Sequence, residues 1–65
     1  MAKKLHRIKE VAKAKGKSGY WIAKETEISY NSIHGYMNDK IEPSLTNLFR
    51  IAEALGVNPK ELINS

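Results

Sequence analysis

With 65 residues, the chain can form one domain with a small core, which leaves little room for the deep cleft of an enzyme. It contains no cysteine, which excludes disulfides and thiolate zinc sites, and no apolar run approaches the roughly 18 residues of a membrane span. The net charge is +4 overall, but residues 1–17 carry seven basic residues and one acidic residue. This excess of positive charge suggests nucleic acid or an acidic membrane surface as a partner, or it is only a solvated lysine-rich face.

The first two expected helices have apolar residues three or four positions apart. In the first helix these residues are Leu5, Ile8 and Ala12, with Val11 beside them. Gly16 supplies a C-terminal stop. Ser18 is expected to cap the second helix, which turns Ile22 and Ala23 inward and ends near residue 26 or 27.

The third segment, EISYNSIHGYM at residues 27–37, has a composition that forms helices poorly. Ser29 can cap it, and Ile33 with either Tyr36 or Met37 is expected on its inner face. Gly35 costs about 0.8 to 1 kcal/mol of helix propensity relative to alanine. The segment is therefore either a loop or a helix whose polar side chains contact something outside the fold.

Ser44 can cap a fourth helix, which ends near residue 56. Its apolar stripe is expected to consist of Leu45, Leu48, Ala52 and Leu55, with Ile51 beside them. Asn58, Pro59 and Glu61 fit the N-cap, N1 and N3 positions of a short fifth helix docked by Leu62. No segment alternates with period two, so we predict an all-α, compact bundle of five short helices that forms a single domain over residues 1–65.

The second and third helices are joined by a very short turn. Between Ala23 and Ile33, both expected to face inward, there is room for a turn of only three or four residues with Ile28 buried beneath it, which is the helix-turn-helix arrangement. From about Leu5 to Leu62 the chain resembles the Cro and phage-repressor type helix-turn-helix proteins, often called the XRE family, which implies a lambda-repressor-like fold. The resemblance is carried by Ser18, Ile22, Ala23, Ile28, Ser29, Ile33, the PSLTNLFRIAEALGV run at residues 43–57, and Leu62.

Four positions depart from the family pattern. Members usually have Gln at position 19, Gly at 27, Glu at 37 and Gly at 39, where this chain has Gly19, Glu27, Met37 and Asp39. Glu and Asp tolerate a positive φ less well than glycine, so the family's turn geometry is less favourable at positions 27 and 39.

The resemblance implies that the third helix, from about Ser29 to Met37, reads base edges in the major groove. The implied base-contacting residues are Tyr30, Asn31, Ser32, His34 and Gly35. An asparagine amide can pair bidentately with adenine, a serine hydroxyl can donate or accept, and a missing side chain at position 35 could admit a thymine methyl or the groove floor. The alternative is that these residues are only tolerated on a solvated face.

The resemblance also implies phosphate contacts at the start of the second helix, where backbone N–H groups and the helix dipole attract anions, and in the loop after the third helix. The candidates are Lys17, Ser18, Gly19, Tyr20, Asn38 and Lys40. The implied partner is double-stranded DNA with a palindromic operator, bound by a weak homodimer that is completed on the DNA. The candidate dimer interface consists of Val57, Pro59 and Ile63.

Two function classes stay open at this point. The first is a sequence-specific transcriptional regulator, a repressor, that binds double-stranded DNA. The second is a protein-interaction module, such as an antitoxin or adaptor, that uses Tyr20, Trp21 and Phe49 as an exposed aromatic face; Trp21 is expected at the core boundary, outside it, or against lysine stems of the first helix. The sequence does not place a nucleophile, a general base and a residue that orients the base together, so we expect no enzyme activity. Its carboxylates do not cluster at the spacing of metal ligands, and we expect no metal site and no cofactor. We expect a cytoplasmic, nucleoid-associated protein of prokaryotic or phage type with no membrane partner.

Overall fold

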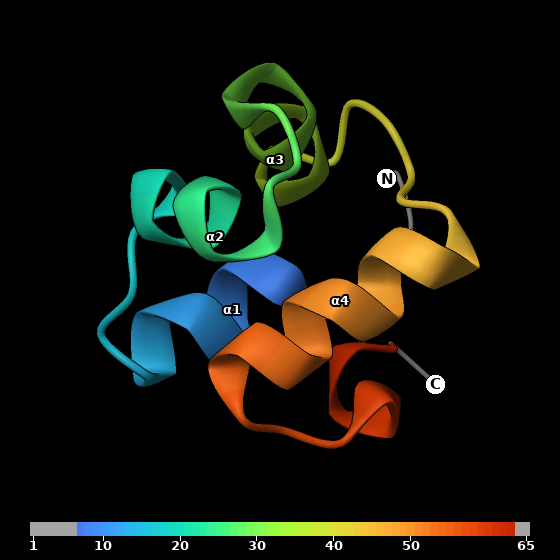
Figure 1. The fold of residues 1–65 in the computed structure, drawn as a ribbon. Coiled ribbons are helices and arrows are strands. Elements are labelled where there is room, and N and C mark those ends of the chain that lie inside the picture. The colour runs from blue at the N-terminus through green and yellow to red at the C-terminus, as the bar shows by residue number, and fades with distance from the viewer. Residues whose placement is uncertain (1–6, 64–65) are drawn as a thin grey trace.

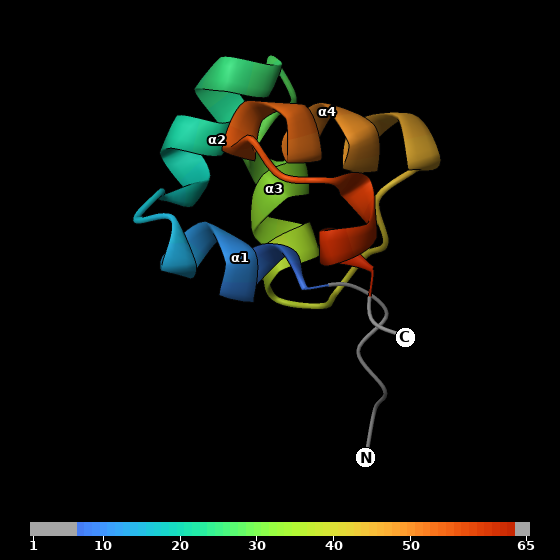
Figure 2. The same cartoon turned by 90° about the horizontal axis from the view of Figure 1, so that it is seen from below.

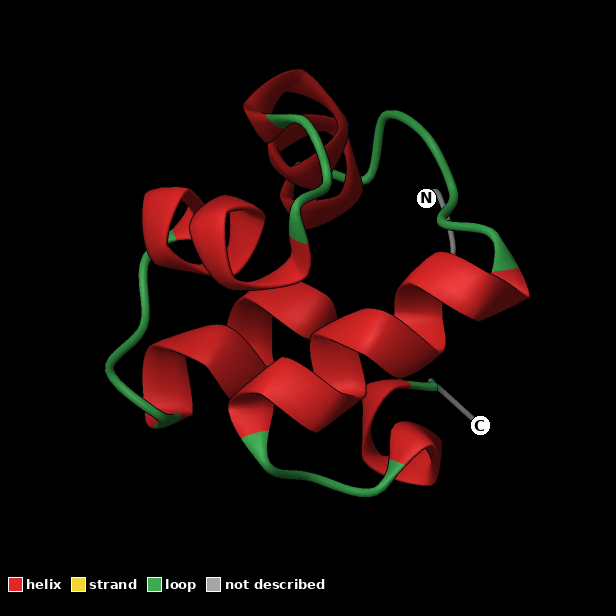
Figure 3. Cartoon of the chain, in the orientation of Figure 1, coloured by secondary structure: helices red, strands yellow, loops and turns green. Residues whose placement is uncertain are grey.

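The computed structural model describes residues 7–63, so the predicted place of Leu5 in the first helix lies outside the described residues. The chain forms α1 (Ile8–Ala14), α2 (Gly19–Thr26), α3 (Tyr30–Met37), α4 (Leu45–Leu55) and a 3-10 helix, η1 (Pro59–Leu62) (Figure 1). In Figure 1, α2 and α3 lie above α1 and α4, and η1 lies below α4. Within the described residues the elements are helices joined by loops, without strands (Figure 3), as the sequence predicts.

The prediction of five α-helices is wrong in its last element. Residues 59–62 form a single 3-10 turn, in which the backbone N–H of Glu61 donates to the Asn58 carbonyl and that of Ile63 to the Lys60 carbonyl. Its predicted N-terminal signals are confirmed, because Asn58 and Glu61 form a capping box with Pro59 inside the first turn. The turn goes no further because Ile63 is extended, with φ −95° and ψ 129°.

Three of the other four predicted helices begin at serines, as expected. The Oγ atoms of Ser18, Ser29 and Ser44 accept the backbone N–H three residues later, at 3.1, 3.2 and 3.2 Å. Each bond satisfies one of the donors that a helix leaves free at its start, which is why these positions define where α2, α3 and α4 begin. The predicted stops are also present, since Gly16 and Gly56 have φ values of 70° and 71°.

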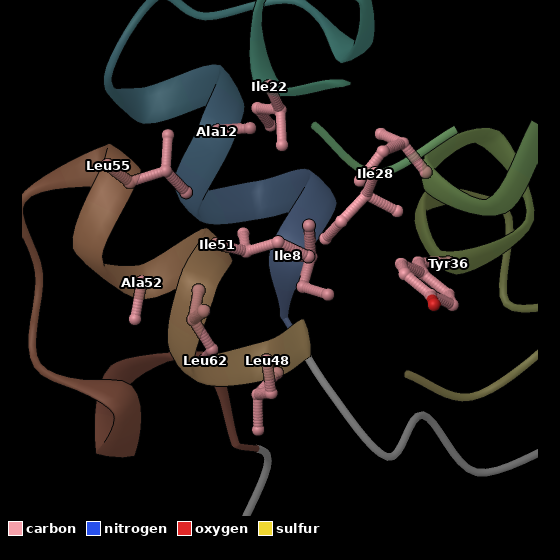
Figure 4. Packing of buried hydrophobic residues seen from close by; sticks show 11 residues of the cluster. Ile8, Ala12, Ile22, Ile28, Tyr36, Leu48, Ile51, Ala52, Leu55 and Leu62 are labelled. Carbon is pink, nitrogen blue, oxygen red and sulfur yellow. The ribbon is translucent and has the colours of Figure 1, made fainter. Parts of the chain in front are cut away.

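One hydrophobic core receives residues from every element (Figure 4). Its buried apolar members are Ile8, Ala12, Ile22, Ile28, Ile33, Tyr36, Leu48, Ile51, Ala52, Leu55 and Leu62. Leu45 was expected in this core and is 66% exposed instead. The buried stripe of α4 runs through Leu48, Ile51 and Leu55, and Leu45 lies at its edge on the side shared with Phe49, four residues later.

The turn between α2 and α3 is held from inside. The hydroxyl of the buried Thr26 donates to the Ile22 carbonyl at 2.7 Å, and its Oγ1 accepts the backbone N–H of Ile28 at 3.3 Å. Ile28 is buried beneath the turn, as predicted. The turn therefore keeps a left-handed residue, Glu27 with φ 61°, without the usual glycine.

Two long-range hydrogen bonds fasten the outer elements. The Nδ2 atom of Asn47 in α4 donates to the hydroxyl of the buried Tyr36 in α3 at 3.0 Å. The backbone N–H of Arg7 donates to the Leu62 carbonyl at 2.7 Å, which ties the start of α1 to the end of η1, two elements that lie close together in Figure 2. Along residues 7–63 no helix has the length and hydropathy needed to cross a membrane.

Candidate nucleic-acid interface

One face of α3 is turned away from the core. Ile33 and Tyr36 are buried, and Met37 is partly buried and packs against the core. The opposite face exposes Tyr30, Asn31, His34 and Asn38. These residues lie one, three or four positions apart, so they form one continuous stripe along the helix.

Asn31 is the polar side chain of this stripe with the most freedom to bind. It is exposed, and in residues 7–63 no hydrogen bond involves its amide group. By contrast, the Nδ2 atom of Asn38 donates to the His34 carbonyl at 2.8 Å and closes the end of α3. Both an amide donor and an amide acceptor of Asn31 are thus available for a base edge.

Ser32 lies partly buried at the side of the exposed stripe. Its Oγ accepts a hydrogen bond from the Ser29 hydroxyl at 3.0 Å, while Ser29 caps the backbone N–H of Ser32. The two serines therefore fix the first turn of α3, and the Ser32 hydroxyl proton is still able to donate.

Aromatic rings connect the starts of α2 and α3. The rings of Tyr20 and Tyr30 stack at a centroid distance of 4.2 Å and an interplanar angle of 4°, and His34 lies 5.8 Å from Tyr30 in a tilted arrangement. Partial burial, with a smaller effect of the neighbouring Tyr20 hydroxyl, raises the pKa of the Tyr30 phenol. Tyr30 is therefore neutral near pH 7 and has one ring face covered, so its hydroxyl and ring edge are the parts available to DNA.

Gly35 does not lie open to a base, and this part of the predicted interface is wrong. The residue is buried, and a Cβ atom built on it would lie 2.6 Å from Ile41 Cγ1 and 2.8 Å from Ile41 Cδ1. The backbone N–H groups of Lys40 and Ile41 donate to the Gly35 carbonyl at 2.9 and 3.4 Å. The helix tolerates glycine here because the loop after α3 folds back onto it.

The predicted phosphate-contacting residues of α2 lie together at the start of that helix. Ser18 is the N-cap, and the exposed ring of Tyr20 stacks on Tyr30 of α3. Lys17 is exposed, and its Nζ lies 4.6 Å from the centroid of the Trp21 ring. Trp21 itself is partly buried and packs against the core, at the boundary that the sequence predicts.

Gly19 permits close packing of α2 on α3. A Cβ atom at position 19 would lie 3.2 Å from the sulfur of Met37 and 3.5 Å from the Tyr30 ring. Positions 19 and 37 are two of the four at which the chain departs from the family pattern, and the structure places these two residues against each other. A side chain at position 19 would require Met37 to move.

At the other end of α3, Asp39 and Lys40 are exposed in the loop. Asp39 has a φ of 58°, so the chain again keeps a left-handed turn without glycine. Lys40 is anchored by its backbone N–H to Gly35, and its side chain is exposed. The phosphate-contacting candidates thus divide between the start of α2 and the loop after α3.

Of the predicted dimer residues, Val57 and Pro59 are partly buried and Ile63 is 44% exposed. Two larger apolar side chains of α4 are exposed: Phe49 at 50%, as the aromatic-face alternative expects, and Leu45 at 66%, which sequence reasoning placed in the core. Their four-residue spacing could have indicated an outward edge of the helix. Among the described residues no group of three or more His, Cys, Asp or Glu side chains could hold a metal ion.

The fold agrees with known proteins. A family model described as Helix-turn-helix matches residues 8–62. The chain is similar to the crystal structure of a candidate DNA-binding protein from Bacteroides fragilis, with 40% sequence identity, a TM-score of 0.88, and coverage of 92% of this chain and 97% of that one. It is also similar to the restriction-modification controller protein C.AhdI from Aeromonas hydrophila, with 29% identity, a TM-score of 0.79, and coverage of 85% and 83%. Nothing among the curated proteins matches. The chain belongs to the XRE-type family of helix-turn-helix DNA-binding regulators.

Proposed function

We propose that this protein is a transcriptional repressor that recognises a specific double-stranded DNA sequence by placing α3 in the major groove. The observation that supports this most directly is the exposed stripe of Tyr30, Asn31, His34 and Asn38 on a helix whose opposite face is anchored in the core. A surface helix held in this way presents its side chains at fixed positions, which direct reading of bases requires.

Asn31 is the main base-reading residue in this proposal. It lies in the first turn of α3, and its unpaired amide can accept from and donate to the N6 and N7 edge of adenine. His34, one turn later, and the Tyr30 hydroxyl supply further donors and acceptors along the same stripe.

Phosphate contacts come from the two ends of α3. Tyr20 reaches the first turn of α3 through its stack on Tyr30, with Lys17, Ser18 and Gly19 beside it at the start of α2, whereas Asn38 and Lys40 follow the last turn of α3. The eight residues of α3 span about 12 Å at roughly 1.5 Å per residue, which is close to the width of the major groove of about 12 Å. Groups at both ends can therefore meet the two strands that border the groove.

The proposal includes a weak homodimer that forms fully on a palindromic operator. A single recognition helix reads only a few base pairs, so specificity requires two copies about 34 Å apart. Ile63, with Val57 and Pro59, provides a small apolar surface for pairing, and Leu45 and Phe49 on α4 are further exposed apolar side chains. The description of the Aeromonas relative as a controller protein supports a regulatory role.

The protein-interaction alternative loses Trp21 from its aromatic face, because Trp21 packs against the core with Lys17 over its ring. Tyr20, which stacks on Tyr30, stays 69% exposed. Phe49 lies on α4 and lines a shallow groove there with Thr46, Arg50 and Glu53.

Selection of bound duplexes from random DNA at two salt concentrations tests the proposed function. We expect one enriched sequence, and an affinity that falls steeply with salt, with a log–log slope of about −0.9 for each phosphate contact. Affinity that does not change with salt, or no enrichment, would refute the proposal.

The selected duplex and a scrambled one then test the reading residue. Asn31→Ala is expected to lose about 1 to 3 kcal/mol of binding free energy on the selected duplex and almost none on the scrambled one, because an amide reads base edges and not phosphates. Equal loss on both duplexes would remove Asn31 from the reading role. A purely protein-binding function predicts no loss on either.

A further inference from the structure

Ile41 lies against α3 where Gly35 has no side chain. A Cβ atom at position 35 would lie within 2.8 Å of both Cγ1 and Cδ1 of Ile41, so the end of the isoleucine occupies the space that a side chain at that position would use. The hydrogen bonds from the Lys40 and Ile41 N–H groups to the Gly35 carbonyl hold it there. A loop residue thus adds an apolar group to the surface of α3.

This apolar group lies on the same side of α3 as the exposed amides. Gly35 follows Asn31 by four residues and precedes Asn38 by three, and residues at these spacings are neighbours on a helix surface. Both asparagines are exposed, and Ile41 is itself 48% exposed. Because Ile41 covers Gly35 between these two asparagines, we infer that its exposed part lies beside the Asn31 amide.

We propose that Ile41 is a base-contacting residue and that it packs against the 5-methyl group of a thymine near the base pair read by Asn31. This inference rests on the proposed DNA-binding function. The isoleucine side chain has no charge and no hydrogen-bonding group, so it matches neither a phosphate nor a polar base edge. The thymine methyl is the apolar group that base pairs expose in the major groove, and apolar side chains are its partners.

The proposed contact of Ile41 with a thymine methyl also explains why glycine is found at position 35. With any other residue there, the side chain of that residue would occupy the flank of the stripe and displace Ile41. Glycine removes this competition, and the loop backbone supplies the hydrogen bonds that hold Ile41 in place. Base specificity on this flank is then set by a residue outside the recognition helix.

Deoxyuridine provides a direct probe, because it differs from thymidine only in lacking the methyl group. Each thymine of the selected duplex is replaced in turn, and the affinity ratio of the two duplexes is measured. At one position in each half-site, we expect the replacement of thymidine by deoxyuridine to lower the binding affinity about fourfold. This corresponds to about 0.8 kcal/mol for one buried methyl-sized group. Ile41→Ala is expected to bring that ratio close to one at the same position.

Val11→Ala is the control, since it trims a branched apolar side chain of α1 that packs partly buried against the core and has no part in the proposed interface. It is expected to keep the fourfold ratio. Ile41→Val retains the branched Cβ and lacks only Cδ1, so it is expected to give an intermediate affinity ratio. If thermal unfolding shows that Ile41→Ala is not folded, Ile41→Val alone tests whether Ile41 contacts the thymine methyl.

Two results would overturn the inference: no thymine whose methyl group matters to the unaltered protein, or a methyl effect that both Ile41 variants retain in full. Either result with a selected duplex still bound leaves the proposed function standing. If random DNA yields no selected duplex, the proposed function fails and the inference fails with it.

Discussion

The turn before α3 and the loop after it both place a non-glycine residue in the left-handed region, Glu27 at φ 61° and Asp39 at φ 58°. The first turn is held by side-chain hydrogen bonds of the buried Thr26 and by burial of Ile28. The second is held by backbone hydrogen bonds to Gly35 and by a half-exposed isoleucine. The first turn therefore belongs to the core, whereas the second belongs to the exposed surface that we propose for DNA binding.

The largest expected difference between the two turns is in stability. Ile28→Ala is expected to lower the free energy of unfolding by about 2 to 5 kcal/mol, because it opens a cavity beneath the first turn. Ile41→Ala is expected to cost at most about 1 kcal/mol, since half of that side chain is exposed. Chemical denaturation of the two variants measures both values, and equal losses would show that the loop is as much part of the core as the turn.

A double-mutant cycle sharpens the account of the loop. In the unaltered chain, Gly35→Ala drives a Cβ atom into Ile41, and overpacking of this kind costs about 1 to 3 kcal/mol. In the Ile41→Ala background, the nearest remaining atom of that residue is its Cβ at 3.9 Å. The same substitution should then stabilise α3 by about 0.8 to 1 kcal/mol through helix propensity.

Denaturation of the unaltered protein, both single variants and the pair gives the coupling between the two positions. Effects that simply add would mean that Ile41 does not occupy the space above Gly35.

Glycine substitution tests the backbone geometry that the two turns share. Glu27→Gly is expected to stabilise the protein by about 1 kcal/mol, because it relieves a left-handed conformation that L-residues avoid. Asp39→Gly should gain less, since Asp enters this region more readily than Glu. Glu25→Gly, two residues before the first turn and within α2, is the control and should destabilise by about 0.5 to 1 kcal/mol. A shift of thermal unfolding in the opposite direction for Glu27→Gly would contradict the account.

The smallest expected change in stability accompanies a change in DNA binding. Lys40→Ala removes an exposed lysine of the second loop, and it should weaken all duplexes about equally and reduce the salt slope by about one unit. Lys24→Ala, near the first turn, should leave the slope unchanged. Neither change should move Tm appreciably. If Lys24→Ala reduced the salt slope of binding and Lys40→Ala did not, the first turn and not the second would lie against the phosphates, which is the reverse of the proposed orientation.

The helix starts and stops could be predicted from the sequence because their signals are local. A serine three residues before the N–H that it caps, or a glycine just past the last turn, acts within a few positions of the helix end. Periodicity likewise identified Ile33 and Tyr36 as candidates for the inner face of α3. The exposed stripe that includes Asn31 follows from the same periodicity.

Features that depend on distant residues could not be read in this way. Gly35 was expected at the groove because nothing in the spacing shows that Ile41 returns across a loop to cover it. The stack of Tyr20 on Tyr30 depends on the crossing of two helices. Leu45 fits the apolar period of α4 but lies past the edge of the core, since periodicity gives the direction of a side chain and not whether another element covers it.

The hydrogen bond from the Arg7 N–H to the Leu62 carbonyl has a consequence for how the molecule opens. It joins positions near the two ends of the described chain, so it closes a long loop, and the entropic cost of closing a loop grows with its length. Fraying of α1 away from η1 exposes the Arg7 amide to solvent, and so does complete unfolding. Deuterium exchange at this one amide, compared with exchange at the buried Ile33 amide of α3, therefore measures whether the ends of the domain open separately or only together with its centre.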